Sequence, residues 1–204
     1  MDYEVEIRAW MDDIPSIWKT MPFLNQLEWK KEKWQTSMFG RKIFEAGELL
    51  RISKIGLGTH SKFFLGWKSV DKGNVANIRE ELGEEITNGI INSTILKTVG
   101  LHRTDFRTSD QVVSALAEYD LLPFMTFSGE NIVAKDTEKN ISFKIMQCND
   151  INFNLLIETE KTAESLDEAF QFEKELIKFA RQNKIENRIV HEEPPTLLYL
   201  KNNE

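Results

Sequence analysis

The sequence predicts an α+β fold, in which mostly antiparallel strands are accompanied by a few helices. Three observations support this prediction. Polar and apolar residues alternate over several short segments, which is the period of a half-buried strand. Two of these segments, near opposite ends of the chain, carry paired glutamates on one side. A few other stretches have helix-capping residues and helical spacing of apolar residues.

The composition is typical of one soluble globular unit, and we expect a single domain over residues 1–204. The 204 residues are 41% hydrophobic and 29% charged, and the formal net charge is −7. This charge argues against non-specific binding to nucleic acid or to an anionic membrane. Cys148 is the only cysteine, which excludes an intrachain disulfide, and no signal region or membrane-length apolar run is visible. We therefore expect a cytoplasmic protein, while the oligomeric state stays open, a homodimer included.

The first strand-like segment runs from Tyr3 to Arg8, and the last runs from Leu155 to Glu160. Side chains alternate across a strand, so each segment places two glutamates on one side and apolar residues on the other. These residues are Glu4 and Glu6, with Arg8 beside them, and Glu158 and Glu160. On a solvated sheet face they would simply meet water, whereas carboxylates crowded on a covered face need protons or a cation. Two such strands side by side would form a four-carboxylate metal site.

The other elements are predicted from caps and alternation. Asp13 before Pro15 favours a short helix, and Ser109 favours the N-cap of a helix to about Leu121. Ser165 and Glu168 form a capping box for a long helix with an apolar stripe. We expect further strands at residues 28–39, 49–55, 63–68, 77–82 and 141–148, a hairpin into Ile43 and Phe44, and strands within residues 83–104.

Several predicted strands carry a basic residue opposite their apolar side. These residues are Arg51, Lys68, Arg79 and Lys144. In an open sheet they would face water, and in a closed or nearly closed barrel they would line a hydrated interior while helices cover the outside. Carboxylate oxygens suit Mg²⁺ or Mn²⁺, which share their coordination with phosphate oxygens, and nearby cations suit the remaining phosphate charge. The constellation therefore predicts a site for a small-molecule triphosphate or polyphosphate.

Other sequence features argue against alternative chemistries. The stretch from Gly56 to Lys62 lacks the spacing of a phosphate-binding P-loop, and we expect it to be a hairpin loop. His60, His102 and His191 have no metal-ligand spacing among themselves. Cys148 has no histidine partner nearby in the sequence, which argues against a thiol nucleophile.

The opening Glu4-Val-Glu6-Ile-Arg8 resembles the E-x-E-x-K opening of the CYTH, or triphosphate tunnel metalloenzyme, superfamily. This superfamily includes class IV adenylyl cyclases, thiamine triphosphatases and inorganic triphosphatases. Further similarities follow in order at Leu50-Arg51-Ile52, Gly66-Trp67-Lys68, Arg79-Glu80-Glu81, Glu158-Thr159-Glu160 and, for the cyclase-like branch, Pro195-Thr196-Leu197-Leu198-Tyr199-Leu200. Each motif is short, and their order over nearly the whole chain makes the resemblance specific.

The resemblance implies an eight-stranded antiparallel barrel that holds Mg²⁺ or Mn²⁺ and grips a triphosphate. By position, it implies metal ligands at Glu4, Glu6, Glu81, Glu158 and Glu160, phosphate contacts from Arg8, Arg51, Lys68, Arg79 and Lys144, and a catalytic set of Glu4, Glu6 and Arg8. We expect metal-dependent hydrolysis of a nucleoside or other organic triphosphate. The alternatives are cyclase activity, which converts ATP to cyclic AMP and pyrophosphate, and binding of a nucleotide or polyphosphate without turnover.

Four positions depart from the family pattern. Arg8 stands where the family has a lysine, and a guanidinium cannot give up a proton near neutral pH to act as a general base. Gly129 and Asn131 stand where many members have a K-x-R pair, and Lys144 is a candidate to replace that charge. Cys148 stands where an acidic residue usually precedes the second glutamate strand. These departures are the reason for keeping a non-catalytic binding module among the alternatives.

Overall fold

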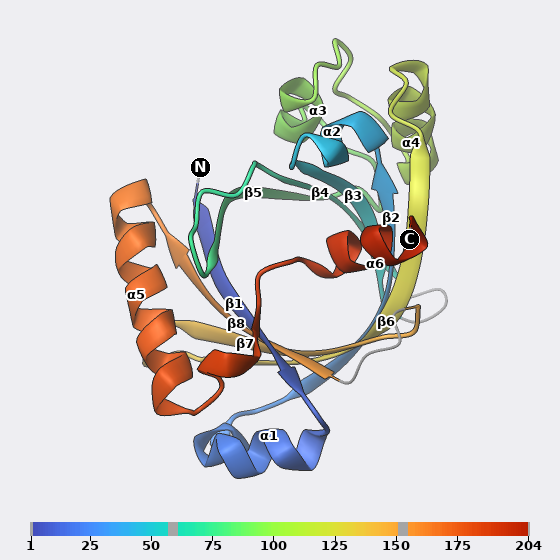
Figure 1. Cartoon of the computed structure of the whole chain (residues 1–204). Coiled ribbons are helices and arrows are strands. Elements are labelled where there is room, and N and C mark those ends of the chain that lie inside the picture. The colour runs from blue at the N-terminus through green and yellow to red at the C-terminus, as the bar shows by residue number, and fades with distance from the viewer. Residues whose placement is uncertain (1, 57–60, 151–154, 204) are drawn as a thin grey trace. The chain divides into compact units, whose positions relative to one another are not determined.

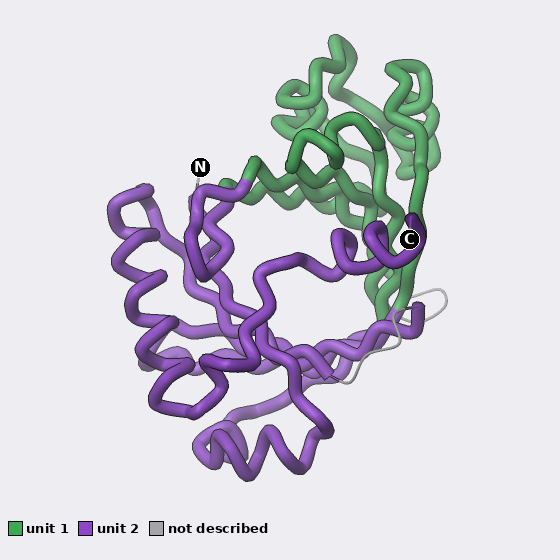
Figure 2. The backbone as a smooth tube through the Cα atoms, viewed as in Figure 1, with its two compact units in different colours: residues 1, 33–70, 80–128 green, residues 2–32, 71–79, 129–204 purple. Residues whose placement is uncertain are grey.

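The computed structural model describes residues 2–56, 61–150 and 155–203, and the chain divides into two compact units (Figure 2). Unit 1 contains Lys33–Val70 and Glu80–Ser128, and unit 2 contains Asp2–Glu32, Asp71–Arg79 and Gly129–Glu204. The single domain over residues 1–204 stays a prediction. Most of the predicted loop between Gly56 and Lys62, His60 included, lies outside the described residues.

The strands pair in an order that returns to its starting point. They are β1 (Tyr3–Met11), β2 (Lys30–Phe39), β3 (Leu49–Ile55), β4 (Lys62–Lys68), β5 (Asn77–Glu85), β6 (Pro123–Asp136), β7 (Ile141–Cys148), β8 (Leu155–Ala163) and β9 (Ile189–Val190) (Figure 1). The hydrogen-bonded order is β5-β4-β3-β2-β6-β7-β8-β1-β9, and β5 also pairs with β1. This is the connectivity of a closed eight-stranded barrel, and the registered pairs are antiparallel. The predicted fold class is therefore confirmed.

The helices differ in length and in how they are capped. They are α1 (Ile14–Thr20), α2 (Arg41–Glu45), α3 (Thr94–Thr98), α4 (Ser109–Glu118), α5 (Leu166–Gln182) and α6 (Pro194–Asn202), with short 3₁₀ helices η1 (Pro22–Gln26) and η3 (Glu186–Arg188). Asp13 caps α1 as predicted, because its Oδ1 accepts a hydrogen bond from the Ser16 N–H at 2.7 Å. Within the described ranges, no helix combines the length and the apolar character needed to cross a membrane.

Unit 2 is built around the apolar side of β1. Val5, Ile7 and Ala9 are at most 2% exposed, and α5 packs against β1 and β8 (Figure 1). Residues of the predicted stripe of α5, among them Ala169 and Leu176, are buried in the same core. Strand alternation then turns Glu4, Glu6 and Arg8 to the opposite side of β1, which is where the candidate site lies.

Unit 1 has its own core. Leu50 of β3, Leu65 of β4, Leu96 of α3 and Leu116 of α4 belong to one buried cluster. Arg51 lies on the opposite side of β3 from Leu50, because neighbouring residues of a strand point to opposite faces. The predicted separation of apolar and basic sides is therefore present in this unit too.

Several sequence predictions in unit 1 are wrong. Ile43 and Phe44 form the short helix α2 instead of a hairpin strand, and β2 pairs with β3 instead. Strand β5 ends at Glu85, and α3 forms within residues 83–104 because the Ser93 Oγ caps it by accepting from the Leu96 N–H at 3.0 Å. Helix α4 is capped by Thr108 instead of Ser109, and it ends at Glu118.

Other elements were missed by the sequence analysis, and one half of a predicted capping box was wrong. The sequence predicted neither β6 nor α6. At the start of α5, the Ser165 Oγ accepts from the Glu168 N–H at 3.2 Å as predicted. The Glu168 carboxylate accepts from the Glu164 N–H at 2.8 Å.

Candidate functional site

The two glutamate strands are neighbours. β1 and β8 pair so that Arg8 lies opposite Glu158 and Glu6 lies opposite Glu160. Directly opposed residues of an antiparallel pair share one face, so all four side chains point to the same side. Because this side is defined by its charges, we call it the charged face. The predicted juxtaposition of the two strands is therefore confirmed.

Strands β7 and β6 extend the charged face. Lys144 of β7 lies opposite Glu158, and Ser142 lies opposite Glu160. On β6, Lys135 lies opposite Ser142. The face thus carries one row of Lys144, Glu158 and Arg8 and a second row of Lys135, Ser142, Glu160 and Glu6. Glu4 lies on the same face two residues before Glu6, and it is opposite Thr162.

Arg8 is the most densely bonded residue of the face. Its side chain is only 2% exposed, and its Nε donates to the Glu158 Oε2 at 2.9 Å. Its Nη1 donates to the Asn77 Oδ1, and its Nη2 donates to the Glu6 Oε1. Because these groups occupy its guanidinium donors, Arg8 orients the site's own carboxylates. Its predicted contact with a substrate phosphate stays a prediction.

The charges around Arg8 and Lys144 keep both side chains protonated. Burial alone lowers the pKa of Arg8, but the nearby carboxylates, Glu6 foremost, outweigh it and raise the pKa above its usual value. Lys144 donates to the Glu158 Oε1, and its pKa is likewise raised by Glu158 and Glu6 against the opposing effect of burial. Neither group can serve as a general base near neutral pH.

Replacing Lys144 by Met is expected to lower the free energy of unfolding by about 1–3 kcal/mol at pH 7, because Glu158 loses a charged hydrogen-bond donor. The pKa of Lys144 is raised in the folded protein, so its contribution is fully present below the unfolded pKa of about 10.4 and is lost as the pH rises further. Urea denaturation of wild type and variant between pH 6 and 11 checks this. A stability difference that grows above pH 10 would contradict it.

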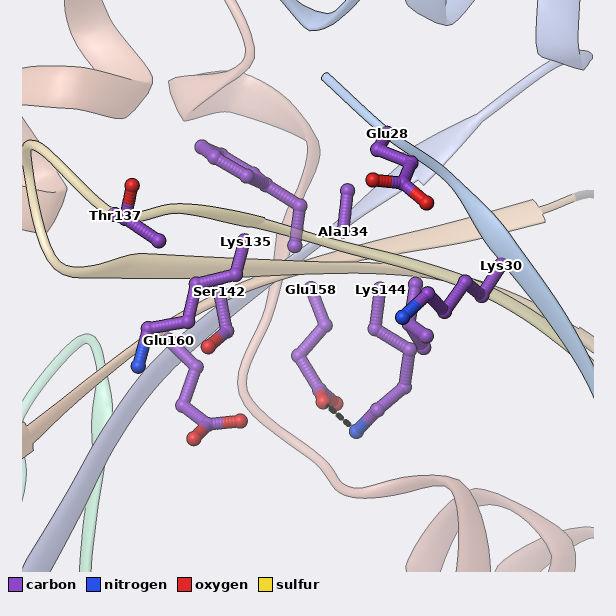
Figure 3. A pocket seen from close by; sticks show the side chains of 11 residues that line it. Glu28, Lys30, Ala134, Lys135, Thr137, Ser142, Lys144, Glu158 and Glu160 are labelled. Carbon is purple, nitrogen blue, oxygen red and sulfur yellow. Dashed lines mark hydrogen bonds and ion pairs between the residues drawn. The ribbon is translucent and has the colours of Figure 1, made fainter.

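A cavity of about 530 Å³ opens over the part of the charged face that β6, β7 and β8 form (Figure 3). Lys144 and Glu158 line it, as do Glu160, Ser142, Lys135 and, from the start of β2, Lys30. In the part of the chain that the structure describes, the ammonium groups of Lys30 and Lys135 have no hydrogen-bond or ion-pair partner. The cavity therefore contains Lys144, which is already bound to a carboxylate, together with two lysines, Lys30 and Lys135, that remain available to an anion.

Arg79 contacts the segment that follows β9. Its Nε lies 2.8 Å from the Glu193 Oε1, and the Glu193 Oε2 lies 3.8 Å from the Arg8 Nη2. Glu193 is only 3% exposed. Its buried carboxylate thus lies between two of the arginines that the sequence assigned to phosphate.

The remaining predicted residues lie in unit 1. Arg51 pairs with Glu81 through an Nη2 to Oε1 distance of 2.8 Å, and the buried Lys68 lies opposite Glu81 on β4. Gly66 leaves room for Arg51, because a Cβ there would lie 3.1 Å from the Arg51 Nε. Arg51, Lys68 and Glu81 therefore share one side of unit 1, and their roles stay predictions.

The charge of the face suits a divalent cation, although its carboxylates are not gathered around one point. In the part of the chain that the structure describes, no group of three or more Asp, Glu, His or Cys side chains is arranged to hold a metal ion. Glu158 and Glu6 instead engage Arg8. The face carries four glutamates against Arg8, Lys144 and Lys135, which leaves one negative charge. Mg²⁺ and Mn²⁺ accept such oxygen ligands when phosphate oxygens complete the shell.

Sequence reasoning missed Lys30, Lys135, Ser142, Asn77 and Glu193. Lys135 could have been found from the sequence, because its residue number differs from those of Gly129 and Asn131 by an even number. On a strand, all three residues therefore point to the same face. Asn77 and Glu193 reach Arg8 only through the folded chain, so no local pattern could have assigned them.

Comparison with known proteins shows the fold. No family model matches the chain, and no curated protein matches it. Protein PH1819 of Pyrococcus horikoshii OT3 is 17% identical, with a TM-score of 0.73 over 97% of this chain and 99% of that one. A candidate adenylate cyclase from Vibrio parahaemolyticus is 11% identical, with a TM-score of 0.69 over 97% of this chain and 98% of that one.

A third similar structure carries an activity in its name. HpAC1 of Hippeastrum, described as a candidate adenylyl cyclase with a dominant triphosphatase activity, is 17% identical, with a TM-score of 0.58 over 98% of this chain and 96% of that one. The chain therefore has the fold of these proteins, and its strand order is that of the eight-stranded antiparallel barrel that the sequence resemblance implied.

Proposed function

We propose that the protein binds and hydrolyses an organic triphosphate with the help of Mg²⁺ or Mn²⁺. One observation carries the proposal, namely that the glutamate pair of β8, which is paired with the glutamate strand β1, lines a cavity of about 530 Å³ together with Lys144 and with two lysines whose ammonium groups have no carboxylate partner in the described chain. Similarity in fold to a plant protein with dominant triphosphatase activity supports it.

Each part of the charged face has a role in this proposal. Lys135 and Lys30 bind phosphate oxygens, because their ammonium groups are not engaged by carboxylates of the described chain. Glu4, Glu6 and Glu160 would hold the divalent cation, which would supply charge neutralisation and activation of water when bound. Arg8 and Lys144 fix the position of Glu158 and offset its charge. Neither cyclisation nor binding without turnover is favoured by a separate observation.

Replacing Glu160 by Gln is expected to lower the rate of triphosphate hydrolysis by about 10²–10³-fold, because a carboxylate that would hold the divalent cation at the reacting phosphates becomes neutral. The measurement is phosphate release from tripolyphosphate, thiamine triphosphate and nucleoside triphosphates with Mg²⁺ or Mn²⁺. Cyclic AMP formed from ATP is assayed in parallel, to detect the cyclase alternative.

Glu164→Gln is the matched control, since Glu164 is exposed just beyond the end of β8. It should keep the wild-type rate. A wild-type protein that releases no more phosphate than Glu160→Gln from any of these triphosphates would rule out hydrolysis.

A further inference from the structure

The segment after β9 is attached to the region around the start of β5 by two side-chain contacts. The His191 Nε2 lies 3.1 Å from the Asp71 Oδ2, and the Glu193 Oε1 lies 2.8 Å from the Arg79 Nε. Glu193 is also the residue from which α6 begins, and its C=O accepts from the Leu197 N–H at 3.0 Å. The position of Glu193 is thus coupled to the start of a helix.

The carboxylate of Glu193 has the chemistry of an internal substitute for phosphate. Guanidinium groups bind carboxylate and phosphate oxygens in the same manner, through charge-assisted hydrogen bonds. Glu193 approaches Arg79 at 2.8 Å and Arg8 at 3.8 Å. A phosphoryl group that used these guanidinium groups would have to replace the Glu193 carboxylate.

Burial makes the competition strong. Glu193 is 3% exposed and Arg79 is 9% exposed, so water screens their attraction weakly. A carboxylate and a cation buried together hold each other, and either of them left alone would be costly. Glu193 can therefore leave only when another anion takes its place beside Arg79.

The outer part of the segment is held less firmly. His191 is 46% exposed in its side chain, and its Nδ1 lies 3.4 Å from the Val75 carbonyl oxygen. An exposed contact such as that of His191 with Asp71 contributes about 0–1 kcal/mol to stability even when both groups are charged. Pro194 and Pro195 follow Glu193 and have no backbone N–H with which to extend a sheet. The carboxylate of Glu193 is therefore the main polar attachment of this segment.

We propose that Glu193 holds the guanidinium group of Arg79 from within the chain and competes with a polyphosphate for it. This inference rests on the proposed function and adds a regulation of the same site. Glu193 keeps Arg79 neutralised until a polyphosphate arrives, and the displaced carboxylate then loosens the segment from residue 190 to the start of α6.

The test compares Glu193→Gln with Glu192→Gln by calorimetric titration of tripolyphosphate in the presence of Mg²⁺. Both variants lose one negative charge from adjacent positions, but Glu192 is exposed, whereas Glu193 is buried against Arg79. The dissociation constant is expected to fall about tenfold in Glu193→Gln, which corresponds to a difference of about 1.4 kcal/mol. In Glu192→Gln it should change less than twofold.

The outcomes separate this inference from the proposed function. Equal or weaker binding by a folded Glu193→Gln, beside a wild type that binds, overturns the inference and leaves the proposed function standing. Binding by neither protein overturns both. Binding by Glu193→Gln alone supports the inference.

Hydrogen exchange of the wild-type protein gives a second test that needs no variant. Added tripolyphosphate should speed backbone amide exchange in residues 190–202, because the Glu193 carboxylate no longer holds the start of α6. Unchanged or slower exchange there, at saturating tripolyphosphate, would overturn the inference even if Glu193→Gln failed to fold.

Discussion

Replacing Arg8 by Met is expected to lower the free energy of unfolding by about 3–5 kcal/mol. Arg8 is 2% exposed and contacts Glu6, Glu158 and Asn77. Methionine fills much of the volume but leaves buried carboxylates close together without their shared cation. Denaturation in urea at pH 7, with the slope compared between variants to confirm two-state unfolding, measures the loss.

Two further variants make this result interpretable. Arg8→Lys keeps the charge, but one ammonium group cannot reproduce the fork of a guanidinium, so we expect it to recover only part of the stability. Arg188→Met removes an exposed arginine paired with Asp12 at 3.0 Å, and it should cost no more than about 1 kcal/mol. An Arg8→Met protein as stable as Arg188→Met would show that the buried network contributes little.

Replacing Glu173 by Ala is expected to lower the free energy of unfolding by about 3 kcal/mol, because several backbone donors lose their acceptor together. The Glu173 Oε1 accepts from the N–H groups of Asn74, Val75 and Ala76 at 2.9, 2.8 and 3.1 Å. Glu173 itself is 6% exposed in α5. The loop before β5 would lose its anchor, and with it the position of Asn77.

Two further variants show whether the loss of stability comes from the lost acceptor. They are Glu173→Gln and Lys174→Ala. The glutamine retains an acceptor oxygen and should lose less stability than the alanine. Lys174 is exposed on the same helix, and its replacement by the strong helix former Ala should change the free energy of unfolding by less than about 0.5 kcal/mol. Thermal unfolding of the three variants is sufficient, and equal melting temperatures for Glu173→Ala and Lys174→Ala would refute the anchoring role.

The parts of the fold that follow from local alternation were predictable from the sequence. β7 has the predicted bounds of Ile141–Cys148, and the apolar and charged sides of β1 are divided as the alternation required. When one face of a strand is buried, the register of the strand is fixed, because a shift by one residue would turn every apolar side chain toward the solvent. The short helices α2 and α3 were not predictable in this way, because helices of one turn depend on tertiary packing for their stability.

The candidate site was predictable only in part, because local alternation does not reveal contacts between residues that are distant in the sequence. Alternation placed Glu6, Arg8, Glu158 and Glu160 on one face, and the register of β1 with β8 confirms that placement. Alternation cannot reveal which carboxylate binds which cation, since Asn77 and Glu193 reach Arg8 through the folded chain.

The pairing of β1 with β8 also has a consequence for biosynthesis. Arg8 and Glu158 are 150 residues apart in the sequence, so a growing polypeptide holds β1 long before its partner has left the ribosome. Such distant pairing carries a large loop-closure cost and slows folding. Until β8 emerges, the apolar side of the nascent β1 needs cover from a chaperone or from transient local collapse, and without it this strand is exposed to aggregation.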